Sequence, residues 1–405
     1  MRVYLDLLRR EPDFRRLYVA QLIALGGDWF AIIPLLVLLP ELTGTGLWGA
    51  LVLAADTLVF ALVGPYAGTV VDRVDRRMVM VVSNAIAGVA ALLLVLVDSA
   101  ATAWIALVAI GFVAAAKAFA QPASAAALPN LVGPKDLSTA AVLNGASWGT
   151  MLAVGAALGG LVAGTLGPTV CFVADAVLLM TAAVLVSRTR RPFSDPDAVP
   201  RERRPVREDL HEAWTFARRD RRVMALITCK MGPAAGNGAL SLFPLYGAVA
   251  FGVGPLGVGL MYSARGLGAL LGPLFLRRRA TDPADLPPIL IASMAVFGLG
   301  YLALAVTPWF VAVLVLLTIA HAGGGANWIL STYGLQATVP DALRGRVFSA
   351  DYTLATLVIA FSQVGFGLLS EVLAAQTLLA SAGAMVLAFA GFWWLVYGRH
   401  AMERV

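Results

Sequence analysis

Twelve mostly apolar stretches, each long enough to cross a lipid bilayer as a helix, follow one another along this chain of 405 residues. A spanning helix needs roughly 20 consecutive apolar residues, because the hydrocarbon core is about 30 Å thick. Hydrophobic residues make up 60% of the sequence and charged residues only 13%, which excludes an ordinary soluble globular protein. We therefore predict an all-α membrane protein. The expected spans are residues 17–40, 46–71, 78–98, 101–127, 139–163, 167–187, 222–250, 254–276, 286–306, 309–335, 346–373 and 375–397.

The positively charged residues lie almost entirely on one side of this predicted bundle. Of the 30 Lys and Arg residues, 27 fall in the N-terminal arm, in alternate turns, in the long central connection or at the C-terminus, and the opposite loops contain none. The positive-inside rule then places both termini in the cytoplasm. The net charge of +6 does not indicate nucleic-acid binding, because these basic residues border the membrane.

The composition also indicates a compartment. The chain is rich in Ala, Gly and Arg and contains only three Lys, which is typical of a bacterium with GC-rich DNA and favours the inner (cell) membrane. The first apolar run is too long for a cleaved signal peptide. Cys171 and Cys229 lie within apolar runs, so we expect packing residues rather than a disulfide or a metal site.

The sequence divides into two six-helix halves, residues 1–187 and 222–405, joined by a polar linker at 188–221. Similar short motifs recur between the halves at offsets of 208 to 211 residues, as in parallel-repeat transporters that bind substrate between their halves. These motifs are Pro34 and Pro244, Gly64-Pro65 and Gly272-Pro273, and Leu128-Pro129 and Val339-Pro340.

The second part of the linker, Val206 to Arg219, spaces Leu210, Trp214 and Ala217 as on one face of a helix. We interpret it as an amphipathic helix on the cytoplasmic membrane surface. A solvated linker helix is the alternative.

The turn between spans 2 and 3 resembles the loop signature of the major facilitator superfamily, Gly-x-Leu-x-Asp-Arg-x-Gly-Arg-Arg/Lys. This resemblance implies two pseudo-symmetric six-helix halves that alternate in exposing one central site. Val70 replaces the Leu of the signature and Asp75 its second Gly. The matching residues are Gly68, Asp72, Arg73, Arg76 and Arg77.

We interpret these five residues as a conformational latch. Asp72 would accept hydrogen bonds from the start of span 11, near Arg344-Gly345-Arg346, where a helix dipole favours an anion. The alternative is that the arginines only fix the topology.

In span 5, the sequence Gly155-Ala-Ala-Leu-Gly159-Gly160 resembles the exporter signature of the same superfamily, with Ala156 in the position of its Pro. The resemblance implies export rather than uptake. Ordinary close packing of small residues is the alternative.

Further stretches resemble the branch that contains macrolide-type drug exporters and enterobactin-type siderophore exporters. They lie at the start of span 1, at the end of span 4 and at the start of span 11, and the resemblance extends over nearly the whole chain. The stretches are Phe14 to Trp29, Gln121 to Val132 and Leu343 to Phe348.

Six charged residues that lie well inside the predicted spans are candidates for function, because charge is costly there and usually marks function. Four of them lie about 15–18 Å from the cytoplasmic ends of their helices, close to half the membrane thickness, and would share one level. We predict that acids and bases among the six pair with one another. The six are Asp28, Asp56, Lys117, Asp175, Lys230 and Arg265.

Proton coupling needs a carboxylate that binds and releases a proton near neutral pH. Asp28 is our first candidate, with Lys117 as its modulating cation, because helices 1 and 4 line the cavity in the family that the chain resembles. Asp175 is a further candidate on a more peripheral helix, and Asp56 is predicted to lie nearer the external end, as a gate. A static salt bridge is the alternative for each.

Other polar and aromatic residues inside the spans are candidates for contact with substrate, although helix packing is the alternative for each. His321 could titrate near neutral pH. The candidates are Lys230, Asn237, Arg265, His321, Asn327, Trp328 and Gln363.

No catalytic arrangement is present in the sequence, which lacks a phosphate-binding Gly-Lys-Ser/Thr loop and spreads its three His widely. We therefore expect no enzyme activity, metal or cofactor. We predict instead a monomeric secondary transporter that exports an amphipathic drug or siderophore by exchange with protons. The alternatives are a lysolipid or siderophore facilitator without proton coupling, and a membrane receptor built on a transporter fold.

Overall fold

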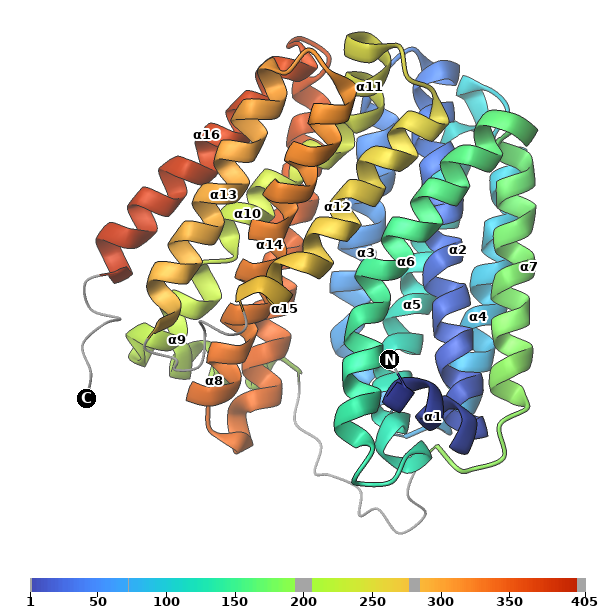
Figure 1. Cartoon of the computed structure of the whole chain (residues 1–405). Coiled ribbons are helices and arrows are strands. Elements are labelled where there is room, and N and C mark those ends of the chain that lie inside the picture. The colour runs from blue at the N-terminus through green and yellow to red at the C-terminus, as the bar shows by residue number, and fades with distance from the viewer. Residues whose placement is uncertain (1, 72, 194–205, 277–284, 399–405) are drawn as a thin grey trace.

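The computed structural model describes residues 2–71, 73–193, 206–276 and 285–398. Within these ranges the regular structure is entirely helical, and twelve segments are long and apolar enough to cross a membrane. The predicted all-α fold of twelve spans is confirmed. Figure 1 shows the two sets of helices side by side.

The first half begins with a short helix and continues with six spans. The short helix α1 lies beside the start of the first span (Figure 1) and was not expected from the sequence. The spans are α2 (Pro12–Thr43), α3 (Leu47–Val71), α4 (Arg76–Leu93), α5 (Ala103–Leu131), α6 (Leu137–Leu166) and α7 (Pro168–Ser187), after α1 (Arg2–Arg10).

The linker helix forms where the sequence predicts it, as α8 (Val206–Arg219), and packs against the eleventh span. The Arg346 guanidinium donates to the Glu212 carboxylate at 2.7 Å and so joins that span to α8. The later spans are α12 (Pro255–Leu276), α13 (Leu286–Val306), α14 (Phe310–Thr338), α15 (Asp341–Leu369) and α16 (Ala375–Trp393), the last followed by a π-helical turn (Trp394–Gly398).

The seventh span is a broken helix rather than the continuous one that hydropathy predicts for residues 222–250. It consists of α9 (Arg221–Thr228), α10 (Met231–Gly236), a 3-10 segment (Asn237–Leu242) and α11 (Phe243–Phe251). Pro233 and Pro244 each lack a backbone donor, which interrupts the regular hydrogen-bond ladder. Such breaks are tolerated in a membrane where protein rather than lipid surrounds them. This segment is largely buried, in agreement with that rule.

The two halves pack against each other mainly through two pairs of helices, α6 with α12 and α3 with α15. The Ser263 hydroxyl on α12 donates to the Ala153 carbonyl on α6 at 2.6 Å. Thr57 on α3 donates to the side-chain oxygen of Gln363 on α15 at 3.3 Å. In Figure 1 the halves converge at the end where α11 lies and separate at the end where α8 and the N-terminus lie.

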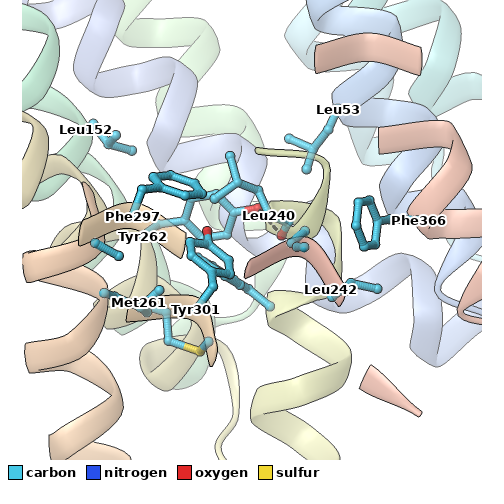
Figure 2. Close-up of a cluster of buried hydrophobic side chains, with 14 of the residues drawn as sticks. Leu53, Leu152, Leu240, Leu242, Met261, Tyr262, Phe297, Tyr301 and Phe366 are labelled. Carbon is cyan, nitrogen blue, oxygen red and sulfur yellow. Dashed lines mark hydrogen bonds between the residues drawn. The ribbon is translucent and has the colours of Figure 1, made fainter. Parts of the chain in front are cut away.

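One buried apolar cluster extends across both halves. Figure 2 shows Leu53 and Leu152 from the first half near Tyr262, Phe297 and other side chains from the second. The Tyr262 hydroxyl donates to the Leu240 carbonyl at 2.9 Å, which fixes α12 to the 3-10 segment of the broken span (Figure 2). The shared core therefore supports the region where the halves meet.

Candidate functional site

Three helices bring one ammonium and two carboxylates together inside the first half. The Lys117 ammonium on α5 lies 2.7 Å from Asp56 Oδ1 on α3 and 3.3 Å from Asp28 Oδ2 on α2. Asp28 is almost fully buried, whereas the side chains of Lys117 and Asp56 are 19% and 28% exposed. The sequence favours a separate external position for Asp56, but the structure places it with the other two.

The charges of this triad do not balance. With both carboxylates ionised the triad carries −1, and with one proton bound it is neutral. Asp28 Oδ1 is buried without a hydrogen-bond partner among the described residues. Because unpaired charge is expensive in a low-dielectric interior, uptake of one proton is the simplest way to neutralise the triad.

Asp175 lies next to the triad on α7. Its Oδ1 contacts the backbone of Gly27, one residue before Asp28, where any larger side chain would collide with it. Asp175 is 2% exposed, and this oxygen has no hydrogen-bond partner within the described part of the chain. The sequence thus correctly groups Asp175 with Asp28 and Lys117 at one depth, although each role remains a prediction.

A cavity of about 360 Å³ opens beside the triad. It lies within the first half, between α2, α4, α5, α6 and α7. Asp28, Lys117 and Trp148 form part of its wall, and much of the remaining wall is apolar. Its uncharged polar lining residues are Gln21, Ser83, Asn84, Gln121, Ser124 and Asn144. The substrate site that the repeat argument places between the halves stays a prediction.

A second ion pair lies in the other half. Lys230, at the break between α9 and α10, donates to Asp351 on α15 and to the Thr332 hydroxyl at 3.2 Å. Its ammonium also lies 5.4 Å from the centre of the Trp328 ring. Asp351 was not among the predicted site residues, although it lies inside the predicted span of residues 346–373.

Arg265, in the middle of α12, projects toward the first half. Its guanidinium carbon lies 5.6 Å from the Trp29 ring centre on α2 and 5.3 Å from the Trp148 ring centre on α6. The predicted pairing of all intramembrane bases with acids does not hold here, since no ion pair of Arg265 is found among the described residues.

The remaining candidates divide into packed and unpaired side chains. His321 is buried, 3.0 Å from the Tyr301 hydroxyl, as expected of a core histidine. Gln363 accepts a hydrogen bond from Thr57 and so joins the halves. The amide oxygens of Asn237 and Asn327 are buried and have no hydrogen-bond partner in the described residues. Unlike His321 and Gln363, these two side chains therefore have an acceptor available for another molecule.

The charged turn after α3 is held to α5 of the first half and to the beginning of the linker. Arg76 donates to the Ala126 and Phe193 carbonyls at 2.9 and 3.1 Å, and Arg77 donates to the Arg191 carbonyl at 2.6 Å. A side chain at Gly68 would meet no other segment of the described chain within 4 Å, and Arg73 is exposed.

The structure describes one of the two acids in this turn, Asp75, and leaves the role of the other, Asp72, untested. Asp75, which departs from the family signature, caps α4 by accepting from the Met78 amide at 2.8 Å. This explains how the turn accommodates it, because an Asp before a helix satisfies a free backbone donor. Asp72 lies outside the described residues, so the latch remains a prediction.

The three glycines of the α6 motif lie at close helix contacts. A side chain on Gly155 would lie 2.5 Å from the Gly26 carbonyl of α2, and one on Gly159 would lie 2.7 Å from the Phe30 carbonyl of the same helix. One on Gly160 would lie 2.5 Å from the Pro255 carbonyl of α12. The motif thus packs α6 against both its own half and the other half.

Comparisons with known proteins agree with this architecture. A sequence model described as Major Facilitator Superfamily matches residues 17–362. No curated protein sequence matches the chain.

Solved structures with the same fold include three transporters. A bacterial homolog of the human lysosomal transporter Spinster, in an inward-facing and unoccupied conformation, is 16% identical over 97% of both chains, with a TM-score of 0.72. Two POT family transporters, in complex with 5-aminolevulinic acid and with a thioalcohol-conjugated peptide, are 10% and 11% identical over 96% of both chains, with TM-scores of 0.78 and 0.77. At these identities the likeness establishes the fold alone.

Proposed function

Since this chain belongs to the Major Facilitator Superfamily, we propose that it is a secondary active transporter that exports an amphipathic small molecule in exchange for protons. The bilayer-spanning bundle of two similar halves is the platform for alternating access. The proton gradient would supply the driving force, without a cofactor, and the substrate would be a drug or a siderophore.

The observation that carries this proposal is the triad of Asp28, Asp56 and Lys117 beside a cavity. An ionisable group at this depth normally marks a substrate or ion pathway. The cavity gives water and substrate a place next to Asp28, and its mixed polar and apolar wall suits an amphipathic molecule.

A proton on Asp28 would change the contacts of Lys117. With both acids ionised, the ammonium is shared between Asp28 and Asp56, whereas protonation of Asp28 leaves Asp56 as the sole charged partner. Two further charged groups lie beside the neighbours of Asp28 on α2: Asp175 on α7 lies against Gly27, and Arg265 on α12 stacks on Trp29. Because the triad ties α2, α3 and α5 together, proton binding would alter the packing of these helices.

Export is favoured by two further features. The α6 glycines resemble an exporter signature, and one of them, Gly160, packs against α12 of the other half. The halves separate at the end where α1 and α8 lie, and by the positive-inside rule the basic N-terminal arm and linker favour a cytoplasmic position for this end. A site reached from the cytoplasm is the state in which an exporter loads its substrate.

The test uses the purified full-length chain in proteoliposomes with an internal pH-sensitive dye. An imposed pH gradient is combined with a macrolide, a catecholate siderophore or a lysophospholipid. At least one compound should move with a counterflow of protons, and Asp28→Asn should reduce this proton flux at least tenfold. Asp285→Asn, which changes an exposed acid before α13, should leave the flux unchanged.

Wild-type proton flux in the Asp28→Asn protein would remove Asp28 from the mechanism. Substrate movement without any proton flux in the wild type would instead indicate a facilitator. Movement of none of the compounds, together with partner binding triggered by a ligand, would favour a receptor.

A further inference from the structure

Arg265 differs from the two other cations in the middle of the spans. Lys117 and Lys230 each form an ion pair with at least one carboxylate. Within the described residues, no Asp or Glu oxygen lies within the 4.0 Å ion-pair distance of Arg265, and its buried Nε has no hydrogen-bond partner. Arg265 lies about ten residues, or roughly 15 Å, from either end of α12, so water and headgroups beyond the membrane are distant.

The two tryptophans hold the guanidinium in place without satisfying its donors. Trp29 and Trp148 present their rings at 5.6 and 5.3 Å, which is cation–π distance. An indole offers one N–H donor and no acceptor, whereas the guanidinium carries five N–H donors. An aromatic clamp therefore fixes the position of Arg265 and leaves its hydrogen-bonding capacity for another molecule.

We propose that Arg265 binds the oxyanion headgroup, a carboxylate or a phosphate, of the transported amphiphile, whose apolar body packs against Trp29 and Trp148. This inference rests on the proposed transport function and adds the charge of the substrate. The planar guanidinium matches a carboxylate or a phosphate with two parallel hydrogen bonds, which a neutral ligand does not offer. An anion would also neutralise a charge that is otherwise costly at this depth.

The position of Arg265 also suits a transport site. The adjacent Gly266 lies so close to α6 that a side chain there would be 2.8 Å from the Ala153 amide nitrogen. Arg265 therefore extends from the second half onto rings of the first, and Trp148 also forms part of the cavity wall with Asp28. A ligand bound there touches both halves, so its affinity would depend on how they are arranged.

The test is an equilibrium binding measurement on the full-length chain in phosphatidylcholine nanodiscs, without a pH gradient. The probe is 11-(dansylamino)undecanoic acid and the comparison probe is its methyl ester, which has the same body without the charge. Energy transfer from tryptophan to dansyl reports binding. The wild type should bind the acid at least tenfold more tightly than the ester.

Matched variants assign this preference to Arg265. Arg265→Gln should weaken binding of the acid at least tenfold and leave binding of the ester unchanged, while Arg265→Lys should retain part of the preference. Lys135→Gln, which removes an exposed cation from the turn between α5 and α6, should behave as the wild type. Equal binding of acid and ester by the wild type overturns the proposal, and so does an unchanged preference in a folded Arg265→Gln protein.

Competition identifies the source of the oxyanion. Displacement of the acid probe by lysophosphatidic acid supports the site and indicates a lipid-like substrate, and displacement by inorganic phosphate supports it and indicates a free anion. A probe that neither compound displaces contradicts the oxyanion assignment. Since no gradient is used, intact acid preference with no proton exchange would refute the proposed coupling alone, and the reverse result would refute the Arg265 site alone.

Discussion

Lys230 and Asp351 form an almost completely buried ion pair, with side chains 1% and 5% exposed. Removing two charges from water is expensive, and their attraction offsets this cost only where the geometry is good. The Thr332 hydroxyl and the Trp328 ring complete the surroundings of the ammonium. The pair connects the broken seventh span with α14 and α15, so its loss would act on three segments.

We predict that Asp351→Asn destabilises the protein by about 3–5 kcal/mol, because Lys230 would then be a buried charge without a carboxylate. The double variant Lys230→Met/Asp351→Leu should recover most of this stability, since it buries no charge at all. Thermal unfolding of the purified proteins, monitored as the loss of the folded peak in size-exclusion chromatography, measures both effects. A single variant as stable as the wild type would contradict the prediction. A stable double variant that no longer transports would give the pair a role in function as well.

The sequence predicts depth along a helix better than direction around it. The rise of about 1.5 Å per residue correctly places Asp28, Lys117 and Asp175 at one level. Asp351 was missed because its acid partner role depends on the broken seventh span: α15 begins at Asp341, and Asp351, ten residues inside it, meets Lys230 at that break. That Asp56 faces Lys117 depends on how α3 is rotated against α5, which helix packing determines and no local pattern reveals.

At the scale of helices, the glycine motif of α6 shows how one short stretch serves two interfaces. Gly159 and Gly160 are adjacent in sequence, so their Cα faces point in different directions around the helix. Gly159 lies against Phe30 of α2, and Gly160 lies against Pro255 and Gly259 of α12. In a membrane, such close approach is a main source of helix association, because lipid tails are as apolar as the helices themselves.

We predict that Gly159→Ala and Gly160→Ala each cost about 1–3 kcal/mol of stability, since the new methyl group would meet backbone atoms that have little room to move. Gly164→Ala on the same helix is the matched control. Its added methyl group would meet no other segment of the described chain within 4 Å, so the substitution should be neutral or stabilising because Ala favours helix. Thermal unfolding of the three variants gives the comparison. Equal melting temperatures for all three would show that these contacts are not tight.

The seventh span shows where sequence patterns fail at this scale. Hydropathy correctly predicts a membrane span here but does not predict that its helix is broken, because Gly and Pro are common in continuous membrane helices as well. The break places the Lys230 side chain against Asp351 and leaves the Asn237 amide oxygen without a partner in the described residues. Both features depend on contacts with α15 and its neighbours that no local window contains.

For the whole molecule, the contacts between the halves show which end is closed. Thr45, in the turn after α2, donates to the Glu371 carboxylate just after α15, and a side chain on Gly46 would lie 3.3 Å from the Ser370 hydroxyl. These contacts lie at the end predicted to be external. In the sequence, Asp72 follows α3 on the side predicted to be cytoplasmic, and the family resemblance implies a latch there that closes the cytoplasmic side. Two latches at opposite ends would balance the two conformations against each other.

This arrangement predicts opposite effects for Glu371→Ala and Asp72→Asn. The first removes a charge-assisted hydrogen bond of about 1 kcal/mol from the closed external end, and should shift the population toward the outward-facing state by about fivefold. The second weakens closure on the cytoplasmic side and should shift the population toward the inward-facing state.

Spin labels on the exposed residues Leu166 and Val306, at the external ends of α6 and α13, report the separation of the halves in a cysteine-free background. Pulsed dipolar spectroscopy should then show longer distances in Glu371→Ala and shorter ones in Asp72→Asn than in the parent. Glu41→Ala, which removes another exposed acid near the external end, should leave the distances unchanged because no ion pair of Glu41 is found among the described residues. If both variants shift the distances in the same direction, the two ends do not act as opposing latches, and the role of Asp72 would be restricted to topology.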